Sequence, residues 1–220
     1  MFKGDHPAVG QAFRRAGELA REFGHARVGS EHLLLALTEG PLAGLAGIER
    51  VVRQAAPDGA GVAADREALA VLGIDLGPLP AELADRPPVK EPLLPLGAAR
   101  VRRRCARAKP PIGLDLQATY AASLRLALAR REREHRIEHV VLALVALDPG
   151  ADWAVRTAGA DSRELLGRLA SAYPPPRRNR LLQAERRMGR RARCRDIVRD
   201  YQRTTGRMAV RPSALTALVH

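Results

Sequence analysis

Two stretches of the chain repeat one pattern, in which a polar helix leads through a histidine-bearing turn into Glu-His and a wholly apolar helix. The first copy reads Phe23-Gly-His-Ala-Arg-Val-Gly-Ser-Glu-His-Leu-Leu-Leu-Ala-Leu-Thr38. The second copy reads Arg133-Glu-His-Arg-Ile-Glu-His-Val-Val-Leu-Ala-Leu-Val145. A helix that is apolar on every side belongs at the centre of a fold. A repeated helical unit without an evident catalytic motif indicates a binding domain rather than an enzyme.

Composition predicts an all-α fold. The chain of 220 residues is rich in alanine, leucine and arginine, and only 3% of it is aromatic. Alanine, leucine and arginine have the highest helix propensities, and this length is enough for one or two domains with a buried core. Apolar residues at three- and four-residue steps from Val9 to Phe23 predict a first helix, opened by Pro7 and ended by Gly24.

Prolines divide the chain. We predict a double repeat over residues 1–173 and a basic, helical or disordered tail over residues 174–220, which follows Pro174-Pro-Pro176. Within the double repeat, the predicted parts are repeat one (2–80), a linker (81–113) and repeat two (114–173). Eight prolines between positions 78 and 111 prevent a long continuous helix in and around the linker.

The tail holds most of the net positive charge. Residues 177–220 contain 13 arginines against three acids, a net charge of +10 within the +13 of the whole chain. Such a segment can bind nucleic acid through its phosphates, with these arginines as candidates: Arg186, Arg187, Arg190, Arg191 and Arg193. Tyr201 is its only aromatic residue, so it offers no stacking platform for single strands. The alternative is a solvated tail, or a helix that docks on an acidic partner.

The repeated motifs resemble the amino-terminal domain of the Clp-family chaperones, such as ClpA and ClpC. The residues that carry the resemblance are Gly24-His25, Gly29-Ser30-Glu31-His32 with the leucines that follow, Leu72-Gly73-Ile74-Asp75, and Arg136-Ile137-Glu138-His139 with its apolar helix. It covers roughly residues 2–172. The second copy lacks the family's Gly-Thr pair, and we expect its turn to be shorter by about three residues. The resemblance implies two four-helix repeats related by a pseudo-twofold axis.

The same resemblance implies a function in protein quality control. The chain has no Gly-x-x-x-x-Gly-Lys-Ser/Thr loop, which an ATPase would use to hold phosphates. It is therefore similar to a stand-alone Clp N-domain, which binds protein or peptide ligands and modulates or shields a Clp chaperone-protease. Clp subunits or their clients are the expected partners, and we expect neither catalysis nor a cofactor. The alternative is a nucleic-acid-associated regulator that acts through the tail.

Four residues are candidates for ligand binding by this resemblance. In the ClpC branch, acids that match Glu31 and Glu138 receive the guanidinium of phosphoarginine, a pairing that a carboxylate makes with two parallel hydrogen bonds. Otherwise each glutamate only stabilises the first turn of its helix. His6 aligns with a family threonine whose second-repeat counterpart falls near Gln117. Phe2 stands where related domains place an aromatic residue against peptides, including cyclic peptide antibiotics, or else it anchors the terminus in the core.

Other chemistry has little support in the sequence. His25, His32, His135 and His139 lack the spacing of a zinc site, so we predict buried turn histidines and no metal. Cys105 and Cys194 also lack metal-ligand spacing, which fits a reducing cytoplasm, although neighbouring arginines would favour redox-sensitive thiolates. There is no nucleophile elbow. No apolar stretch approaches the ~20 residues that span a membrane, and we expect a cytoplasmic protein without membrane contact.

Overall fold

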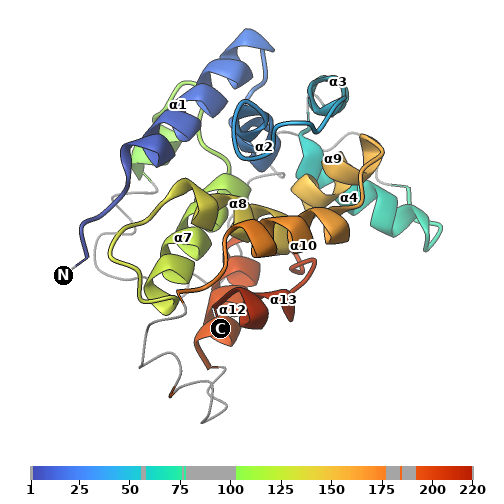
Figure 1. Cartoon of the computed structure of the whole chain (residues 1–220). Helices are drawn as coiled ribbons and strands as arrows, with labels where there is room; N and C mark the ends of the chain where they lie inside the picture. Colours follow the sequence, from blue (N-terminus) through green and yellow to red (C-terminus); the bar gives the residue numbers. More distant parts are fainter. Residues whose placement is uncertain are drawn as a thin grey trace.

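Every regular element among the described residues is a helix, which confirms the all-α prediction (Figure 1). The computed structural model describes residues 2–55, 58–75, 77, 103–176, 184 and 192–219. The helices are α1 (Pro7–Glu22), α2 (Ser30–Thr38), α3 (Ile48–Gln54), α4 (Ala60–Ala70), α7 (Leu114–Ala129), α8 (Ile137–Leu147), α9 (Pro149–Thr157), α10 (Ser162–Ala172), α12 (Ala192–Thr205) and α13 (Ala214–Val219).

Helix α8 is the centre of the core. All of its residues from Val140 to Leu147 are at most 1% exposed, because this stretch has no polar position to turn toward water. Among the described elements, it packs against α1, α2, α7, α9, α10 and α13. Helix α2 is the other buried helix, and Leu33–Leu37 are at most 9% exposed. The apolar helix of each copy is therefore buried, as the sequence pattern predicts.

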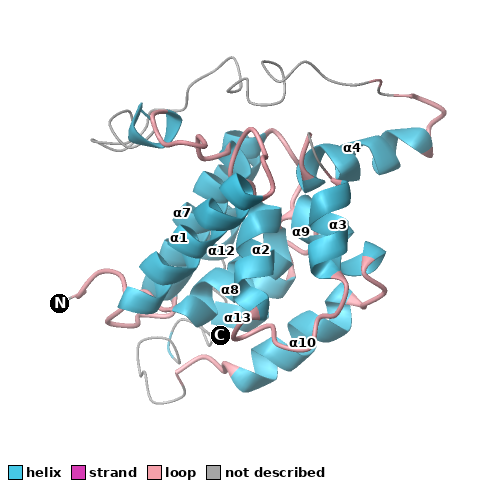
Figure 2. Cartoon of the chain, turned by 90° about the horizontal axis from the view of Figure 1, so that it is seen from above, coloured by secondary structure: helices cyan, strands magenta, loops and turns pink. Residues whose placement is uncertain are grey.

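Local sequence signals place the helix ends. Pro7 opens α1 after His6, whose Nδ1 accepts the N–H of Ala8 at 3.2 Å. Asp161 caps α10 by accepting two backbone N–H groups of its first turn. Helix α1 then packs on α2, α7 packs on α8, and α4 crosses to pack on α9. Figure 2 shows α1 and α7 side by side, with α2 and α8 next to them.

The part of the chain before α12, which we call the body, has one half with α1–α4 and one half with α7–α10. Each half supplies extended backbone to the turn of the other half. Val28, just before α2, forms a parallel β-bridge with Ile112, just before α7. Asp5, just before α1, forms a parallel bridge with His135, just before α8. The flanking hydrogen bonds are short: 2.9 Å from Val28 N to Pro111 O and 2.8 Å from His6 N to His135 O. The two halves are therefore joined by backbone as well as by the apolar core.

The residues from 192 to 219, which we call the C-terminal arm, pack into the same core. Helix α12 lies on α7, and α13 lies on α8 (Figure 1). The buried residues of the arm are Cys194, Ile197, Tyr201, Ala209, Leu215, Leu218 and Val219. This differs from the expectation that the globular part ends at Pro174–Pro176. The arm's apolar residues recur at helical spacing between the arginines, so α12 has a face to bury.

Replacing a buried arm residue should destabilise the whole protein. Leu215 is fully buried, and Leu215→Ala should cost about 2–5 kcal/mol in the free energy of unfolding. Met208 of the same arm is 77% exposed, so the matched change Met208→Ala should stay within about 0.5 kcal/mol. Urea unfolding followed by circular dichroism measures both. Equal midpoints for Leu215→Ala and wild type would mean that the arm is not part of the cooperative core.

Candidate functional site

The turns that lead into α2 and α8 have the same length. Residues 23–29 connect α1 to α2, and residues 130–136 connect α7 to α8. The second residue of each turn has a left-handed backbone: Gly24 has a φ of 69° and Arg131 a φ of 55°. The expectation of a shorter second turn is therefore wrong. Glycine is the usual residue in this conformation. Because the second turn has an arginine there, the sequence did not indicate that Arg131 corresponds to Gly24.

The sequence pattern sets His135 of the second turn against His25 of the first, and the structure does not support this match. His135 occupies the place of Val28, since each forms the β-bridge to the opposite half. The counterpart of His25 is Glu132. His25 Nδ1 lies 2.7 Å from Nε2 of the following helix's histidine, and the Glu132 carboxylate lies 3.2 Å from Nε2 of His139. His6 likewise corresponds to Gly113, the N-cap of α7, and not to Gln117.

Glu31 and Glu138 occupy the same place, the second residue of α2 and of α8. In both copies, the N–H of the N-cap residue donates to Nδ1 of the histidine that follows the glutamate, at 3.0 Å. The two glutamates differ in burial, because Glu31 is 3% exposed and Glu138 is half-buried. They do not share a site: each lines a separate hollow.

Glu138 lines a hollow of about 590 Å³ at the N-terminal end of α8, which we call the Glu138 hollow. Its wall is formed by Lys3, Arg130, Arg131, Glu132, Arg133, Glu134, Arg136, Glu138, Ala172, Tyr173, Pro174 and Pro176. Two of its three carboxylates pair within the wall, Glu132 with Arg130 at 3.0 Å and Glu134 with Arg136 at 3.3 Å. Glu138 makes no ion pair with any residue that the structure describes. Its carboxylate is therefore available in a cationic surrounding.

Arg130 is a buried cation in the wall of the Glu138 hollow, 2% exposed. Its Nη2 donates to the carbonyls of Tyr173 at 3.0 Å and Pro174 at 2.5 Å. Its Nη1 has no hydrogen-bond partner among the described residues. Burial lowers the pKa of Arg130, and the charges of Glu132 and Glu138 oppose that shift. A buried donor without an acceptor is costly, so Arg130 is an incompletely bonded cation behind the wall of the hollow.

Glu31 lines a much smaller hollow of about 30 Å³, the Glu31 hollow. Its wall is formed by Arg27, Gly29, Glu31, Asp58, Gly59, Gly61, Val62, Leu114, Asp115 and Arg207. Arg207 belongs to the C-terminal arm, and its Nε donates to Asp65 Oδ2 of α4 at 2.8 Å. A side chain from far along the sequence therefore forms part of the wall of the hollow that Glu31 lines.

Asp148 is a buried acceptor beside this hollow. It is 1% exposed and caps α9, where its Oδ1 accepts the N–H of Ala151 at 2.7 Å. The hydroxyl of Ser30 donates to the same oxygen at 2.8 Å, and the phenol of Tyr201 donates to Oδ2 at 2.7 Å. Burial raises the pKa of Asp148, and these donors oppose the shift. Aspartate before proline is a usual N-cap signal, and Asp148 followed by Pro149 begins α9 in this way.

Asp115 completes the acidic cluster. It is the second residue of α7, and its Oδ2 accepts the N–H of Ser30 at 2.9 Å. Burial, with the nearby charges of Glu31 and Asp148, raises the pKa of Asp115 to about 7. Three carboxylates thus meet where α2, α7 and α9 begin, and the positive ends of those helices favour their charge.

Phe2 and His6 line neither hollow. His6 is an exposed helix cap, while Phe2 is half-buried beside Lys3, which lines the Glu138 hollow. The candidates for nucleic-acid binding mostly lie outside the described residues: Arg186, Arg187, Arg190 and Arg191. Arg193 lies in α12, and its side chain is also outside the described part.

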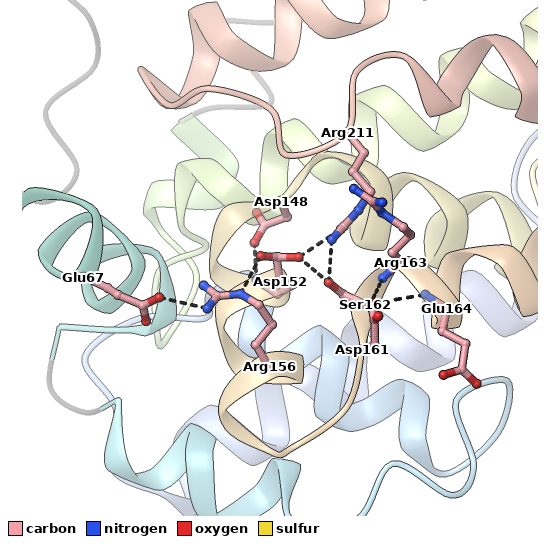
Figure 3. Close-up of polar contacts among 10 residues, drawn as sticks. Glu67, Asp148, Asp152, Arg156, Asp161, Ser162, Arg163, Glu164 and Arg211 are labelled. Atoms are coloured by element: carbon pink, nitrogen blue, oxygen red, sulfur yellow. Dashed lines mark hydrogen bonds and ion pairs between the residues drawn. The ribbon is translucent and has the colours of Figure 1, made fainter. Parts of the chain in front are cut away.

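A second arm arginine binds the body at α9. Arg211 Nη1 donates to Asp152 Oδ1 at 2.9 Å, and its Nη2 donates to the hydroxyl of Ser162 at 2.8 Å (Figure 3). The other oxygen of Asp152 accepts from Arg156 at 3.0 Å, and Arg156 also reaches Glu67 of α4 at 2.8 Å. The arm's charge is thus partly used inside the protein. Sequence spacing gave no sign of the pairs that Arg211 makes or of the pair between Arg156 and Glu67, because those partners are dozens of residues apart.

The turn histidines make structural contacts inside the fold. His32, His135 and His139 are fully buried, as predicted, and His135 contacts Asp5 at 2.8 Å and Ser123 at 2.9 Å. Within the described part of the chain, no three histidine, cysteine, aspartate or glutamate side chains are arranged to hold a metal ion.

Comparison with known proteins adds no relative. No family model, curated protein or solved structure matches the chain. The resemblance to Clp N-domains therefore rests on the residues quoted from the sequence. No helix in the described ranges is both long enough and apolar enough to cross a membrane.

Ionisation of Asp115 should destabilise the fold as the pH rises from about 4 to about 7. The ordinary pKa of its carboxyl is 3.8, against about 7 in the folded protein. The unfolded chain therefore loses this proton first, and ionisation favours unfolding. Asp115→Asn keeps an oxygen for the Ser30 N–H but cannot ionise. Its stability relative to wild type should grow by about 1–3 kcal/mol between pH 4 and pH 7.5 in urea unfolding. A pH-independent difference would contradict this.

Proposed function

We propose that this protein is a non-catalytic binding module that captures protein segments carrying phosphoarginine, and that the Glu138 hollow is its ligand site. The observation that carries the proposal is the combination of a free carboxylate and a buried, incompletely bonded guanidinium in one hollow. Phosphoarginine presents a guanidinium joined directly to a phosphoryl group. A site for it needs an acceptor and an anion-binding donor next to each other.

Glu138 is suited to the guanidinium half of this ligand. Its half-buried carboxylate makes no ion pair among the described residues, and a carboxylate binds a guanidinium through two parallel hydrogen bonds. The place of Glu138 in the first turn of α8 fixes its direction, since the capping by His139 holds the start of the helix.

The wall of the Glu138 hollow is suited to the phosphoryl half. Arg130 contributes its positive charge from behind this wall, and Lys3 and Arg133 add charge around the opening. The N-terminus of α8 is close to the same place, and helix N-termini favour bound anions. Cationic groups on several sides would also exclude an unmodified arginine, because they repel a bare guanidinium.

The open site thus belongs to the second copy of the motif. The sequence favours the first copy, which keeps the full Gly-Ser-Glu-His pattern, but the Glu31 hollow has only about 30 Å³. By its resemblance to the Clp N-domain, the module would act on a Clp chaperone-protease, either by binding clients and adaptors or by shielding them. Cyclic peptide antibiotics would be a further ligand class, with Phe2 next to Lys3 of the wall.

Binding of a phosphoarginine tripeptide should depend on Glu138. In an NMR titration of the full chain with acetyl-Gly-phosphoarginine-Gly, we expect saturable amide shifts at residues 137–139. Glu138→Gln should weaken binding at least tenfold, about 1.4 kcal/mol, because it removes the charge that pairs with the guanidinium. Glu164→Gln, a matched change in the first turn of α10, should bind like wild type.

Two further ligands sharpen this experiment. The same tripeptide with unmodified arginine should bind much more weakly, and so should one with phosphoserine, since each lacks half of the ligand. Equal binding of all three peptides, or equal binding by wild type and Glu138→Gln, would refute the proposed site.

Nucleic-acid binding through the C-terminal arm is the second candidate. Helix α12 carries Arg195, Arg199 and Arg203, which are exposed and recur every four residues, so they share one face. Arginines in such a row can each approach a phosphate of a duplex backbone.

The salt dependence of DNA binding tests this candidate. If these arginines contact phosphates, changing all three to glutamine should lower the slope of log K against log salt by about 2–3 for a 20-base-pair duplex. Fluorescence anisotropy measures the slope. An unchanged slope, or no binding by wild type at low salt, would exclude this role for α12.

A further inference from the structure

The Glu31 hollow holds a guanidinium that the chain itself supplies. Arg207 follows α12 after Gly206, whose left-handed backbone (φ 72°) turns the chain back toward the body. Its side chain is 19% exposed and points between α4 and the start of α2, where it lines the hollow with Glu31.

Helix α4 is shaped to receive this group. Arg207 Nε donates to Asp65 Oδ2 at 2.8 Å. Four residues earlier, on the same face of α4, Gly61 lets the guanidinium lie against the helix. A Cβ at position 61 would be 2.8 Å from Nη1 and 2.9 Å from Cζ of Arg207. No side chain larger than hydrogen fits there while Arg207 is in place.

The electrostatics of the hollow also favour a guanidinium. Glu31, Asp58 and Asp115 line it beside Arg207, and Asp65 binds the guanidinium from its edge. Arg27 is the other cation in its wall. Burial opposes the charge, but the attraction of Asp65 and the more distant carboxylates keeps the pKa of Arg207 above its ordinary value.

We propose that the Glu31 hollow is a guanidinium-binding site and that Arg207 is its internal ligand, so that the C-terminal arm keeps the first copy of the motif closed. An arginine side chain of another protein would enter this hollow only in place of Arg207. The internal occupancy is independent of the proposed function. The identity of the competing ligand rests on the proposed function, because an arginine of another protein requires an arginine-bearing partner.

Only a short segment has to move for this exchange. The arm is anchored by buried residues on both sides, among them Tyr201 and Leu215. The backbone N–H groups of Val210 and Arg211 donate to carbonyls at the end of α8. Met208 between these anchors is 77% exposed. Arg207 can therefore leave the hollow while the rest of the arm keeps its place in the core.

Chemical rescue of Arg207→Ala tests the proposal. We expect millimolar methylguanidinium to raise the melting temperature of this variant saturably, because a ligand that binds only the folded state stabilises it. Its amide signals at Gly59 and Gly61 should shift in the same range. Wild type should show neither effect, since its hollow is already filled. Methylammonium, which has the charge but not the planar donor fork, should act on the variant at least tenfold more weakly.

A double variant provides the matched control. Gly61→Ala with Arg207→Ala puts a methyl group where the guanidinium lies, so it should lose the response to methylguanidinium. If Arg207→Ala is unfolded at 25 °C, recovery of its helical circular dichroism by methylguanidinium, and not by methylammonium, becomes the readout. Equal responses to both cations, in the folded or the unfolded case, would overturn the proposal, as would an equal response of the double variant.

The phosphoarginine tripeptide separates this inference from the proposed function. Calorimetry should give one site for this tripeptide in both wild type and Arg207→Ala if both are correct, because the carboxylates of the emptied Glu31 hollow repel the phosphoryl group. A methylguanidinium response in Arg207→Ala without any tripeptide binding to wild type would support the internal ligand and reject the proposed function. Tripeptide binding to wild type without a methylguanidinium response in Arg207→Ala would support the proposed function and reject Arg207 as an internal ligand.

Discussion

The carboxylate of Asp148 connects the three parts of the chain on which the fold depends. It accepts hydrogen bonds from Ser30 at the start of α2, from Ala151 in α9, and from Tyr201 in the C-terminal arm. A buried carboxylate without donors would cost several kcal/mol, so these three segments are needed together. Burial, together with the charges of Glu31 and Asp148, also raises the pKa of the neighbouring Asp115 to about 7. The fold therefore combines a buried carboxylate that requires several hydrogen-bond donors with an apolar core around α8.

Local rules predicted the helices well. Propensity and periodicity were sufficient for the all-α class, and Pro7 and Gly24 marked real helix ends. The packing of the arm was not predictable in this way. Its partners in the body lie far away in sequence, and an arginine that pairs with Asp65 has the same local pattern as one that faces water. The excess of arginine over acidic residues therefore led to the prediction of a basic tail.

The candidate site was predictable in part. The Glu-His pattern located Glu31 and Glu138 at equivalent helix starts, because capping is encoded within a few residues. The register of the second turn was missed, since Arg131 adopts a conformation that glycine usually marks. Arg130 was missed as well: its burial follows from tertiary packing against Tyr173 and Pro174. Which of two similar glutamates faces an open hollow is decided by side chains that no local motif includes.

The crossed β-bridges mean that neither the Glu31 hollow nor the Glu138 hollow is positioned by one half of the chain alone. The backbone before α7, at Ile112, pairs with the turn before α2, and the backbone before α1, at Asp5, pairs with the turn before α8. Each glutamate thus follows a turn that is positioned by the opposite half. A backbone shift near Asp5 would therefore act on the surroundings of Glu138, and one near Ile112 on those of Glu31. The environment of each glutamate is thus set by residues that lie on the other side of the sequence.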